Sequence, residues 1–194
     1  MEKVLTILLA GGAGERLAPL TRDDAKPMMP FGGIYRLIDI TLSNCINSCL
    51  NRVYVLTQHK ALSLNRHIRQ TWNILSPELG QFIEVVPPTQ RLRNTWYLGT
   101  ADAVSQNIQS IEEEHPKLVL ILSADHVYKM HYGRMIRWHY SQKADITVAT
   151  TQVPSDAASR FGIVQMDKGF IIQGFEEKPR HHYPARSSFN PESI

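Results

Sequence analysis

The sequence predicts an α/β fold whose sheet is mostly parallel. Continuous apolar runs recur along the 194 residues, and stretches with apolar residues at helical spacing separate them. Runs that do not alternate with polar residues are typical of strands buried on both faces, as in parallel sheets. Strands that alternate with helices in this way build an α/β domain, and the chain is long enough to bury a core of its own.

The expected elements follow one another in a regular order. Each predicted strand is a short apolar run, and each predicted helix repeats apolar residues every three or four positions. Residues 23–33 contain too many prolines and glycines for either and are expected to form a loop. The expected elements are strands over 4–9, 52–57, 81–86, 118–122 and 146–151, helices over 38–50, 60–72, 100–111 and 132–140, and a hairpin over 163–175 that turns at 167–169.

The first predicted strand ends in a loop that contains Gly11, Gly12 and Gly14. Glycines let backbone N–H groups approach a phosphate closely, because no Cβ stands in the way. Arg16 adds a planar cation, which suits a phosphate, to the same loop. The loop is therefore a candidate site for a polyphosphate.

The spacing of this glycine loop differs from two better-known phosphate-binding motifs. Leu17 stands where a dinucleotide fingerprint has its third glycine, and Glu15 follows Gly14 where a Walker loop has lysine. An ordinary glycine-rich turn between a strand and a helix is equally compatible with the loop taken alone.

Composition and charge exclude several classes of function. The net charge is +3 with acidic and basic residues interspersed, which argues against nucleic-acid binding. The sequence shows no signal segment and no apolar span long enough for a membrane, so we expect a cytoplasmic protein without membrane contact. Cys45 and Cys49 lie four residues apart on a predicted helix, which suits neither a zinc site nor a disulfide, and they are expected to pack as small core residues.

Asp125 follows the most apolar predicted strand and is the leading candidate for a catalytic residue. The glycine loop, Gln58 and Asp125 all come directly after predicted strands, and ligands of parallel sheets bind at the carboxyl ends of the strands. A carboxylate there can hold Mg²⁺, which commonly bridges protein carboxylates to substrate phosphates. The alternative is that Asp125 only caps the next turn. His126 is expected to orient its neighbours, because Mg²⁺ prefers oxygen ligands.

Two further pairs of residues could contact a ligand. Glu177 and Lys178 follow the last predicted strand, where a carboxylate can accept hydrogen bonds from sugar hydroxyls and an ammonium can bind a phosphate. A solvated surface pair is the alternative reading. Trp96 and Tyr97 precede the predicted helix that begins at Thr100, where their rings could stack on a base or a sugar or pack in the core.

Taken together, these motifs resemble the N-terminal part of the sugar-1-phosphate nucleotidyltransferase family. The resemblance is strongest to the bacterial adenylyl-transferring members, which act on glucose 1-phosphate. Several ordered motifs are far more specific than any one of them. The matching runs are Leu9–Leu17, Ala25–Pro27, Phe31–Gly33, Tyr35–Asp39, Ser43–Ser48, Trp96–Tyr97, Gly99–Ala103, Asp125–Lys129, Phe161–Gly162 and Glu177–Pro179.

The resemblance implies a Rossmann-like, GT-A-type sheet and a specific reaction. ATP and α-D-glucose 1-phosphate would give ADP-glucose and pyrophosphate with Mg²⁺ as cofactor, at the start of glycogen biosynthesis. Lys26 would help to neutralise the leaving pyrophosphate. The residues assigned by motif match are Arg16, Lys26 and Asp125 for catalysis, Gly11, Gly12, Gly14, Arg16, Gln90 and Gly99 for the nucleotide, Tyr97, Gly162, Glu177 and Lys178 for glucose 1-phosphate, and Asp125 for the metal.

The same resemblance implies that the chain is one portion of a longer pattern. In the family the catalytic domain continues into a further sugar-contacting strand and a second metal-binding aspartate, and a C-terminal β-helix domain serves assembly into homo-oligomers. Residues 1–194 match only the N-terminal portion of the catalytic domain, so we expect a truncated sheet. Two alternatives follow: a non-catalytic chain that binds nucleotide or sugar phosphate or acts as a regulatory subunit, and a relative that uses UTP or GTP.

Overall fold

The chain forms two compact units, Met1–Ser141 and Gln142–Ile194. The computed structural model describes residues 3–12, 14, 17–58, 61–88 and 97–179.

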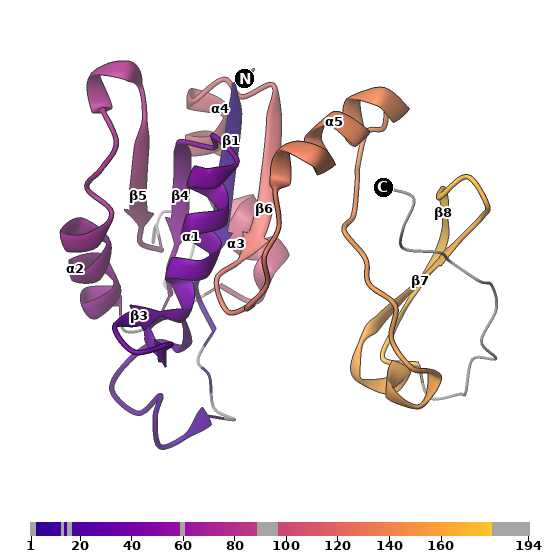
Figure 1. Cartoon of the computed structure of the whole chain (residues 1–194), viewed down its shortest axis with the longest axis horizontal. Coiled ribbons are helices and arrows are strands. Elements are labelled where there is room, and N and C mark those ends of the chain that lie inside the picture. The colour runs from indigo at the N-terminus through magenta and orange to yellow at the C-terminus, as the bar shows by residue number, and fades with distance from the viewer. Residues whose placement is uncertain (1–2, 13, 15–16, 59–60, 89–96, 180–194) are drawn as a thin grey trace. The chain divides into compact units, whose positions relative to one another are not determined.

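A four-stranded parallel sheet forms the centre of the first unit (Figure 1). Its strands are β1 (Val4–Leu9), β4 (Arg52–Leu56), β5 (Phe82–Val86) and β6 (Leu118–Ser123), in the spatial order β5-β4-β1-β6. Every neighbouring pair is parallel. The mostly parallel α/β sheet expected from the apolar runs is confirmed.

Helices cover both faces of this sheet. The helices are α1 (Leu37–Asn47), α2 (Ala61–Thr71), α3 (Thr100–Gln106), α4 (Ile108–Glu113) and α5 (Tyr132–Gln142). Apolar residues of α1, α2 and α5 pack against one face of the sheet, and those of α3 and α4 pack against the other. Figure 1 shows the same layers, with α1 in front of the sheet and α3 and α4 behind it. Burial on both faces explains why five of the six residues of β1 are apolar, with Thr6 as the exception.

Short elements complete the first unit. The loop expected over 23–33 contains the 3₁₀ helix η2 (Lys26–Met28) and the two-residue strand β2 (Pro30–Phe31). β2 pairs with β3 (Tyr35–Arg36), which follows that loop. A second 3₁₀ helix, η3 (Pro77–Leu79), lies between α2 and β5 in the chain.

The helix expected over 100–111 is interrupted at Asn107, which separates α3 from α4. The Asn107 side chain is buried and donates to the Ala103 carbonyl at 2.7 Å and to the Tyr97 hydroxyl at 3.0 Å. Asparagine side chains compete with the backbone for hydrogen bonds, so a break at this position has a local cause.

The second unit contains η4 (Ser155–Arg160) and an antiparallel hairpin of β7 (Gly162–Met166) and β8 (Ile172–Glu177). Its turn is held by Asp167, whose Oδ1 accepts hydrogen bonds from the N–H groups of Gly169 and Ile171. The expected hairpin is confirmed.

The strand expected over 146–151 is wrong: the structure has no helix or strand there. Ile146 and Val148 are exposed. A strand exists only through hydrogen bonds to a neighbouring strand, and an apolar composition does not supply that neighbour.

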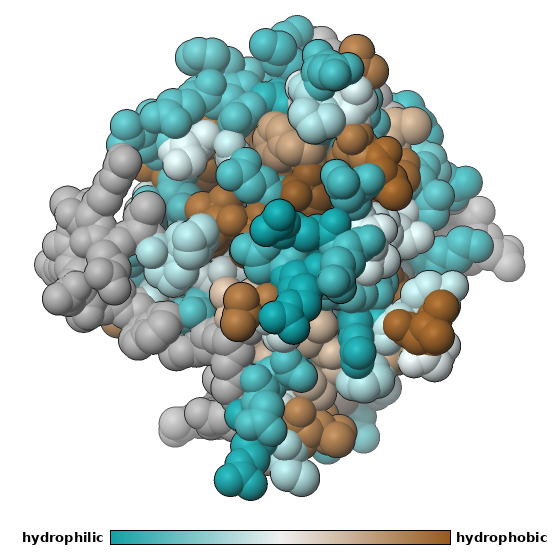
Figure 2. Space-filling view, turned by 90° about the vertical axis from the view of Figure 1, so that its left-hand side faces the viewer, coloured by the Kyte–Doolittle hydropathy of each residue, from teal (hydrophilic) through white to brown (hydrophobic). Residues whose placement is uncertain are grey.

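Figure 2 views the molecule from the side that carries α2 and β5, and hydrophilic side chains dominate it, with hydrophobic ones in small separate patches. Leu62 of α2 and Leu79 of η3 are among the exposed hydrophobic residues. Such scattered exposure is normal for a protein surface. In the described ranges, no helix has both the length and the apolar character that a membrane span requires.

Candidate active site

The parallel sheet brings the expected strand-end residues to one edge. Leu9 of β1 is in register with Leu56 of β4 and with Ser123 of β6, so the three strands end side by side. The glycine loop, Gln58 and Asp125 follow these ends directly. The expected meeting of the three segments at one edge of the sheet is therefore confirmed.

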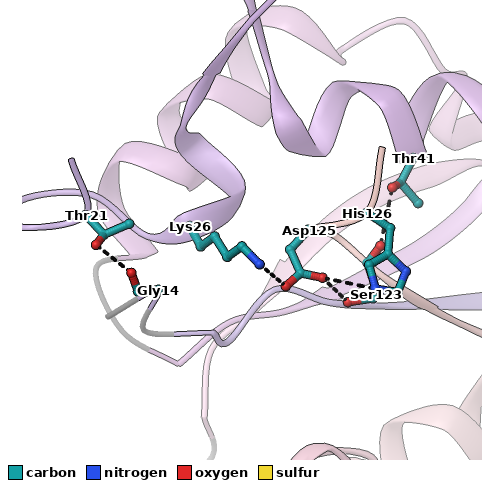
Figure 3. Close-up of polar contacts among 7 residues, drawn as sticks. All are labelled: Gly14, Thr21, Lys26, Thr41, Ser123, Asp125 and His126. Carbon is teal, nitrogen blue, oxygen red and sulfur yellow. Dashed lines mark hydrogen bonds and ion pairs between the residues drawn. The ribbon is translucent and has the colours of Figure 1, made fainter. Parts of the chain in front are cut away.

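The three glycines of the loop have three different surroundings. Gly14 has a φ of +69°, and a Cβ there would lie only 2.7 Å from Cγ2 of Thr21, so only glycine fits. Its carbonyl accepts a hydrogen bond from Thr21 Oγ1 at 2.8 Å (Figure 3). A Cβ on Gly11 would lie 3.3 Å from that of Gln58, whereas Gly12 is exposed and has no described atom within 4 Å of its Cβ position. Of these three glycines, Gly12 is the most open to a ligand.

Lys26 and Asp125 form an ion pair at this edge. The Nζ of Lys26 donates to Oδ2 of Asp125 at 2.6 Å, and each side chain is 30 % exposed. Asp125 Oδ1 accepts a hydrogen bond from Ser123 Oγ at 2.6 Å. Figure 3 shows both oxygens of the carboxylate engaged from opposite sides. His126 lies farther off, with its Nε2 3.8 Å from Oδ1 and most of its ring exposed.

The surroundings of Asp125 keep it ionised at neutral pH. Burial alone would raise the pKa of its carboxyl, but hydrogen bonds from Lys26 and Ser123 and the charge of Lys26 outweigh burial and lower it. An ionised, partly exposed carboxylate is a ligand that suits Mg²⁺. Among the described residues no group of three acidic, histidine or cysteine side chains is placed to hold a metal. A single carboxylate is enough for Mg²⁺ where substrate phosphates and water complete its shell.

The segment around Tyr97 lies beside the glycine loop through Gln58. Gln58 Nε2 donates to the Tyr97 carbonyl at 3.2 Å. The Tyr97 side chain is 7 % exposed and packs in the core with Leu5 and Ile7. The ring was expected either to stack on a ligand or to pack in the core, and the structure places it in the core. A ligand contact by Tyr97 would therefore come from its backbone.

Gly99 stands directly before α3, in extended backbone that any residue adopts. It is exposed, and no atom of the described residues lies within 4 Å of its Cβ position. A flat ring therefore has room to approach this position.

Three of the four expected sugar-phosphate residues come together in the second unit, whereas Tyr97 belongs to the first. Gly162 of β7 is in register with Glu177 of β8, and Lys178 donates its N–H to the Phe161 carbonyl at 3.0 Å. A Cβ on Gly162 would lie 2.7 Å from the Phe175 ring and 3.0 Å from Glu177 Oε2. Lys178 Nζ and Glu177 Oε1 are 3.0 Å apart, with both side chains more than half exposed.

Three of the expected contact residues lie outside the described residues: Arg16, Gln90 and Trp96. Their roles stay predictions. Sequence reasoning had assigned no role to Ser123 or Thr21, which support Asp125 and Gly14. The signal for Ser123 was its position two residues before an aspartate at a strand end, since side chains two apart in extended chain point to the same side.

Comparison with known proteins supplies the family of the chain. Residues 5–189 match the model of the family described as nucleotidyl transferase. The chain is 57 % identical over 195 residues to a protein of Koribacter versatilis named glucose-1-phosphate adenylyltransferase, with all of this chain and 46 % of that protein aligned. Proteins of the same name from Rhodopirellula baltica and Methylococcus capsulatus are each 51 % identical, over 95 % and 91 % of this chain and 42 % of their own length. The chain thus spans less than half the length of these relatives.

Proposed function

The chain belongs to the nucleotidyl transferase family, and on this basis we propose that the protein transfers an adenylyl group from ATP to α-D-glucose 1-phosphate. The products are ADP-glucose and pyrophosphate, and supply of ADP-glucose for glycogen is the corresponding role. The names of the relatives support this choice of substrates. The observation that carries it in this chain is the Lys26–Asp125 pair beside an open glycine loop.

The proposed reaction is a displacement at phosphorus. A phosphate oxygen of glucose 1-phosphate attacks the α-phosphorus of ATP, and one P–O bond forms. The bond from the α-phosphorus to the oxygen that bridges it to the β-phosphorus breaks, and pyrophosphate leaves with that electron pair. The attacking oxygen is already anionic, so no general base is required. Catalysis then consists of positioning and of neutralising charge.

Residues of the first unit would act on the nucleotide. Asp125 would hold Mg²⁺, which when bound neutralises negative charge on the phosphates. Lys26, aimed at the same point, would place its ammonium against the pyrophosphate as that group departs. The backbone of Gly12 is open for a phosphate, and Gly99 leaves room for the base.

Residues of the second unit would act on the sugar phosphate. Glu177 can accept hydrogen bonds from sugar hydroxyls, and Lys178 can hold the phosphate by charge. Their side chains reach solvent and are already close to one another. Gly162 leaves the space that the Phe175 ring and the Glu177 carboxylate occupy.

The test is Mg²⁺-dependent release of pyrophosphate from ATP and glucose 1-phosphate by this chain. We expect Asp125→Asn to lower the rate at least 100-fold, since an amide is a weak ligand for Mg²⁺ and leaves Lys26 without its counter-charge. Asp145→Asn, at an exposed aspartate of the second unit, is the matched control and should leave the rate unchanged.

No release by a folded chain that still binds ATP in calorimetry would contradict the enzymatic proposal. It would instead support the alternative, a chain that binds nucleotide without turnover. Equal release with UTP or GTP in place of ATP would contradict the choice of adenylyl transfer.

A further inference from the structure

One face of α1 carries polar side chains that the proposed function does not use. Thr41 and Asn44 lie in α1 and Ser48 is its C-cap, and their spacing of three and four residues places them in a row along one side of the helix. Thr41 and Ser48 are fully buried and Asn44 is 7 % exposed. Burial of a polar group is unfavourable unless the group is hydrogen-bonded. The partners of this polar row therefore indicate its role.

All three side chains bond to the backbone of one segment, the connection from β6 to α5. Thr41 Oγ1 donates to the carbonyl of the last residue of β6 at 3.3 Å. Asn44 Nδ2 donates to the Tyr128 carbonyl at 2.8 Å, and the first N–H of α5 donates to Ser48 Oγ at 2.8 Å. Residues 124–131 form no helix or strand, so their backbone groups depend on such partners.

The segment held at these three points carries Asp125. Its first anchored residue, Ser123, also donates its hydroxyl to Asp125 Oδ1. Figure 3 shows the succession from Thr41 to Ser123 to Asp125, with Lys26 on the far side of the carboxylate. A shift of the Ser123 backbone would thus move the hydroxyl that orients the carboxylate.

Packing of α1 on the sheet does not require the polar row. Ile38, Leu42 and Cys45 of the same helix are fully buried in the core on that face of the sheet. Apolar side chains in the row would fill the same space but would remove all three hydrogen bonds to the backbone of residues 123–132.

We infer that Thr41, Asn44 and Ser48 are positioning residues that hold the segment 123–132 and thereby place the carboxylate of Asp125 for adenylyl transfer. The effect on catalysis rests on the proposed function, whereas the holding of the segment rests on the three hydrogen bonds alone.

The experiment compares Thr41→Val with Thr41→Ser. Valine has nearly the shape of threonine but lacks the hydroxyl, and serine restores the hydroxyl. Two quantities are measured in each variant: amide hydrogen exchange over residues 123–132, and kcat and KM for pyrophosphate release. Ser43→Ala and Asn47→Ala are matched controls, because both side chains lie on the exposed side of the same helix.

We expect the amides of residues 123–132 to exchange about tenfold faster in Thr41→Val. We also expect kcat to fall about tenfold with KM little changed. Both factors correspond to the loss of one hydrogen bond. Thr41→Ser should restore both, and Ser48→Ala should speed exchange at Tyr132. The controls should match the unsubstituted chain.

Exchange over 123–132 that is unchanged in both Thr41→Val and Ser48→Ala would overturn the inference. A kcat loss in Thr41→Val that Thr41→Ser fails to restore would overturn the link to Asp125. If the unsubstituted chain releases no pyrophosphate, the proposed function fails for this chain, and the exchange rates alone then decide whether the row holds the segment.

Discussion

The Lys26–Asp125 pair of the first unit and the Glu177–Lys178 pair of the second unit differ in how the fold supports them. Lys26 and Asp125 stand at one edge of a four-stranded sheet and join two distant segments of the chain, and Ser123 also donates a hydrogen bond to Asp125. Glu177 and Lys178 stand at the end of a two-stranded hairpin, and their described side-chain contact is with one another. The first pair is 30 % exposed, and the second pair is about twice as exposed.

This contrast matches the different tasks proposed for the two pairs. Charge on a departing pyrophosphate is best neutralised by groups that are already fixed, since fixed groups need no reorganisation during the reaction. A sugar phosphate needs to enter and a sugar nucleotide needs to leave, so exposed residues suit that part of the site. Substitutions in the two regions should therefore differ in the quantity that they change.

The largest expected difference lies between the two lysines. Lys26→Met should lower kcat about 100-fold, because the ammonium is proposed to act on charge that develops as the reaction proceeds. Lys178→Met should mainly raise the KM for glucose 1-phosphate, because that charge is proposed to bind the substrate before the reaction. Steady-state kinetics with both substrates varied separates the two. If both substitutions changed only KM, and by the same factor, the proposed difference in role between Lys26 and Lys178 would be contradicted.

The next largest difference concerns stability at the glycine loop. Gly14→Ala should lower the free energy of unfolding by about 2 kcal/mol, because it combines a positive φ with a close approach to Thr21. Gly12→Ala should change it by less than about 0.5 kcal/mol, since nothing lies near the Cβ position. Urea denaturation measures both. A larger loss of stability in Gly12→Ala than in Gly14→Ala would contradict the described loop.

Gly162 can be compared with Gly14, because a Cβ at either position would lie 2.7 Å from a neighbouring side chain. The neighbour of Gly162 is freer to move. The 2.7 Å approach there is to the ring of Phe175, which is 65 % exposed and can turn away. Gly162→Ala should therefore lower the free energy of unfolding by less than about 1 kcal/mol. It should still raise the KM for glucose 1-phosphate by displacing Glu177. An unfolding cost equal to that of Gly14→Ala would show that the hairpin is as rigid at this point as the glycine loop.

The smallest expected effect is a pH dependence of stability at Asp125. Because the pKa of this carboxyl is lowered in the folded chain, its contribution is present above the ordinary value of about 3.9 and is lost as the pH falls through the folded pKa. We expect about 1 kcal/mol or less from this residue. Urea midpoints at pH 7 and pH 3 should therefore lie closer together in Asp125→Asn. An equal separation in the two proteins would contradict the lowered pKa.

Much of the sheet was predictable from the sequence, and the reason is burial. β1 and β4 were predicted to within a residue, because strands covered on both faces are rich in apolar residues, as VLTILL and RVYVL are. The same reasoning failed over 146–151, where no strand forms. An apolar run becomes a strand only if a neighbouring strand is available for pairing.

The site was predictable where a residue follows a strand directly, as Asp125 does. Supporting contacts between distant segments were not predictable. The bonds from α1 to the segment after β6 join residues more than 80 positions apart, as Thr41 and Ser123 illustrate. The motif Ser43–Ser48 was recognised by resemblance, but the different environments of Asn44 and Asn47, one buried and one exposed, emerge only when the helix is packed.

The most direct test of this account is a double-substitution cycle on Lys26 and Asp125, with kcat/KM for pyrophosphate release as the measured quantity. If the ion pair works as one catalytic unit, the loss in the double variant Lys26→Met, Asp125→Asn should be close to that of the more damaging single change. Losses that multiply would mean that the two side chains act independently, and the paired centre at this edge of the sheet would then be contradicted.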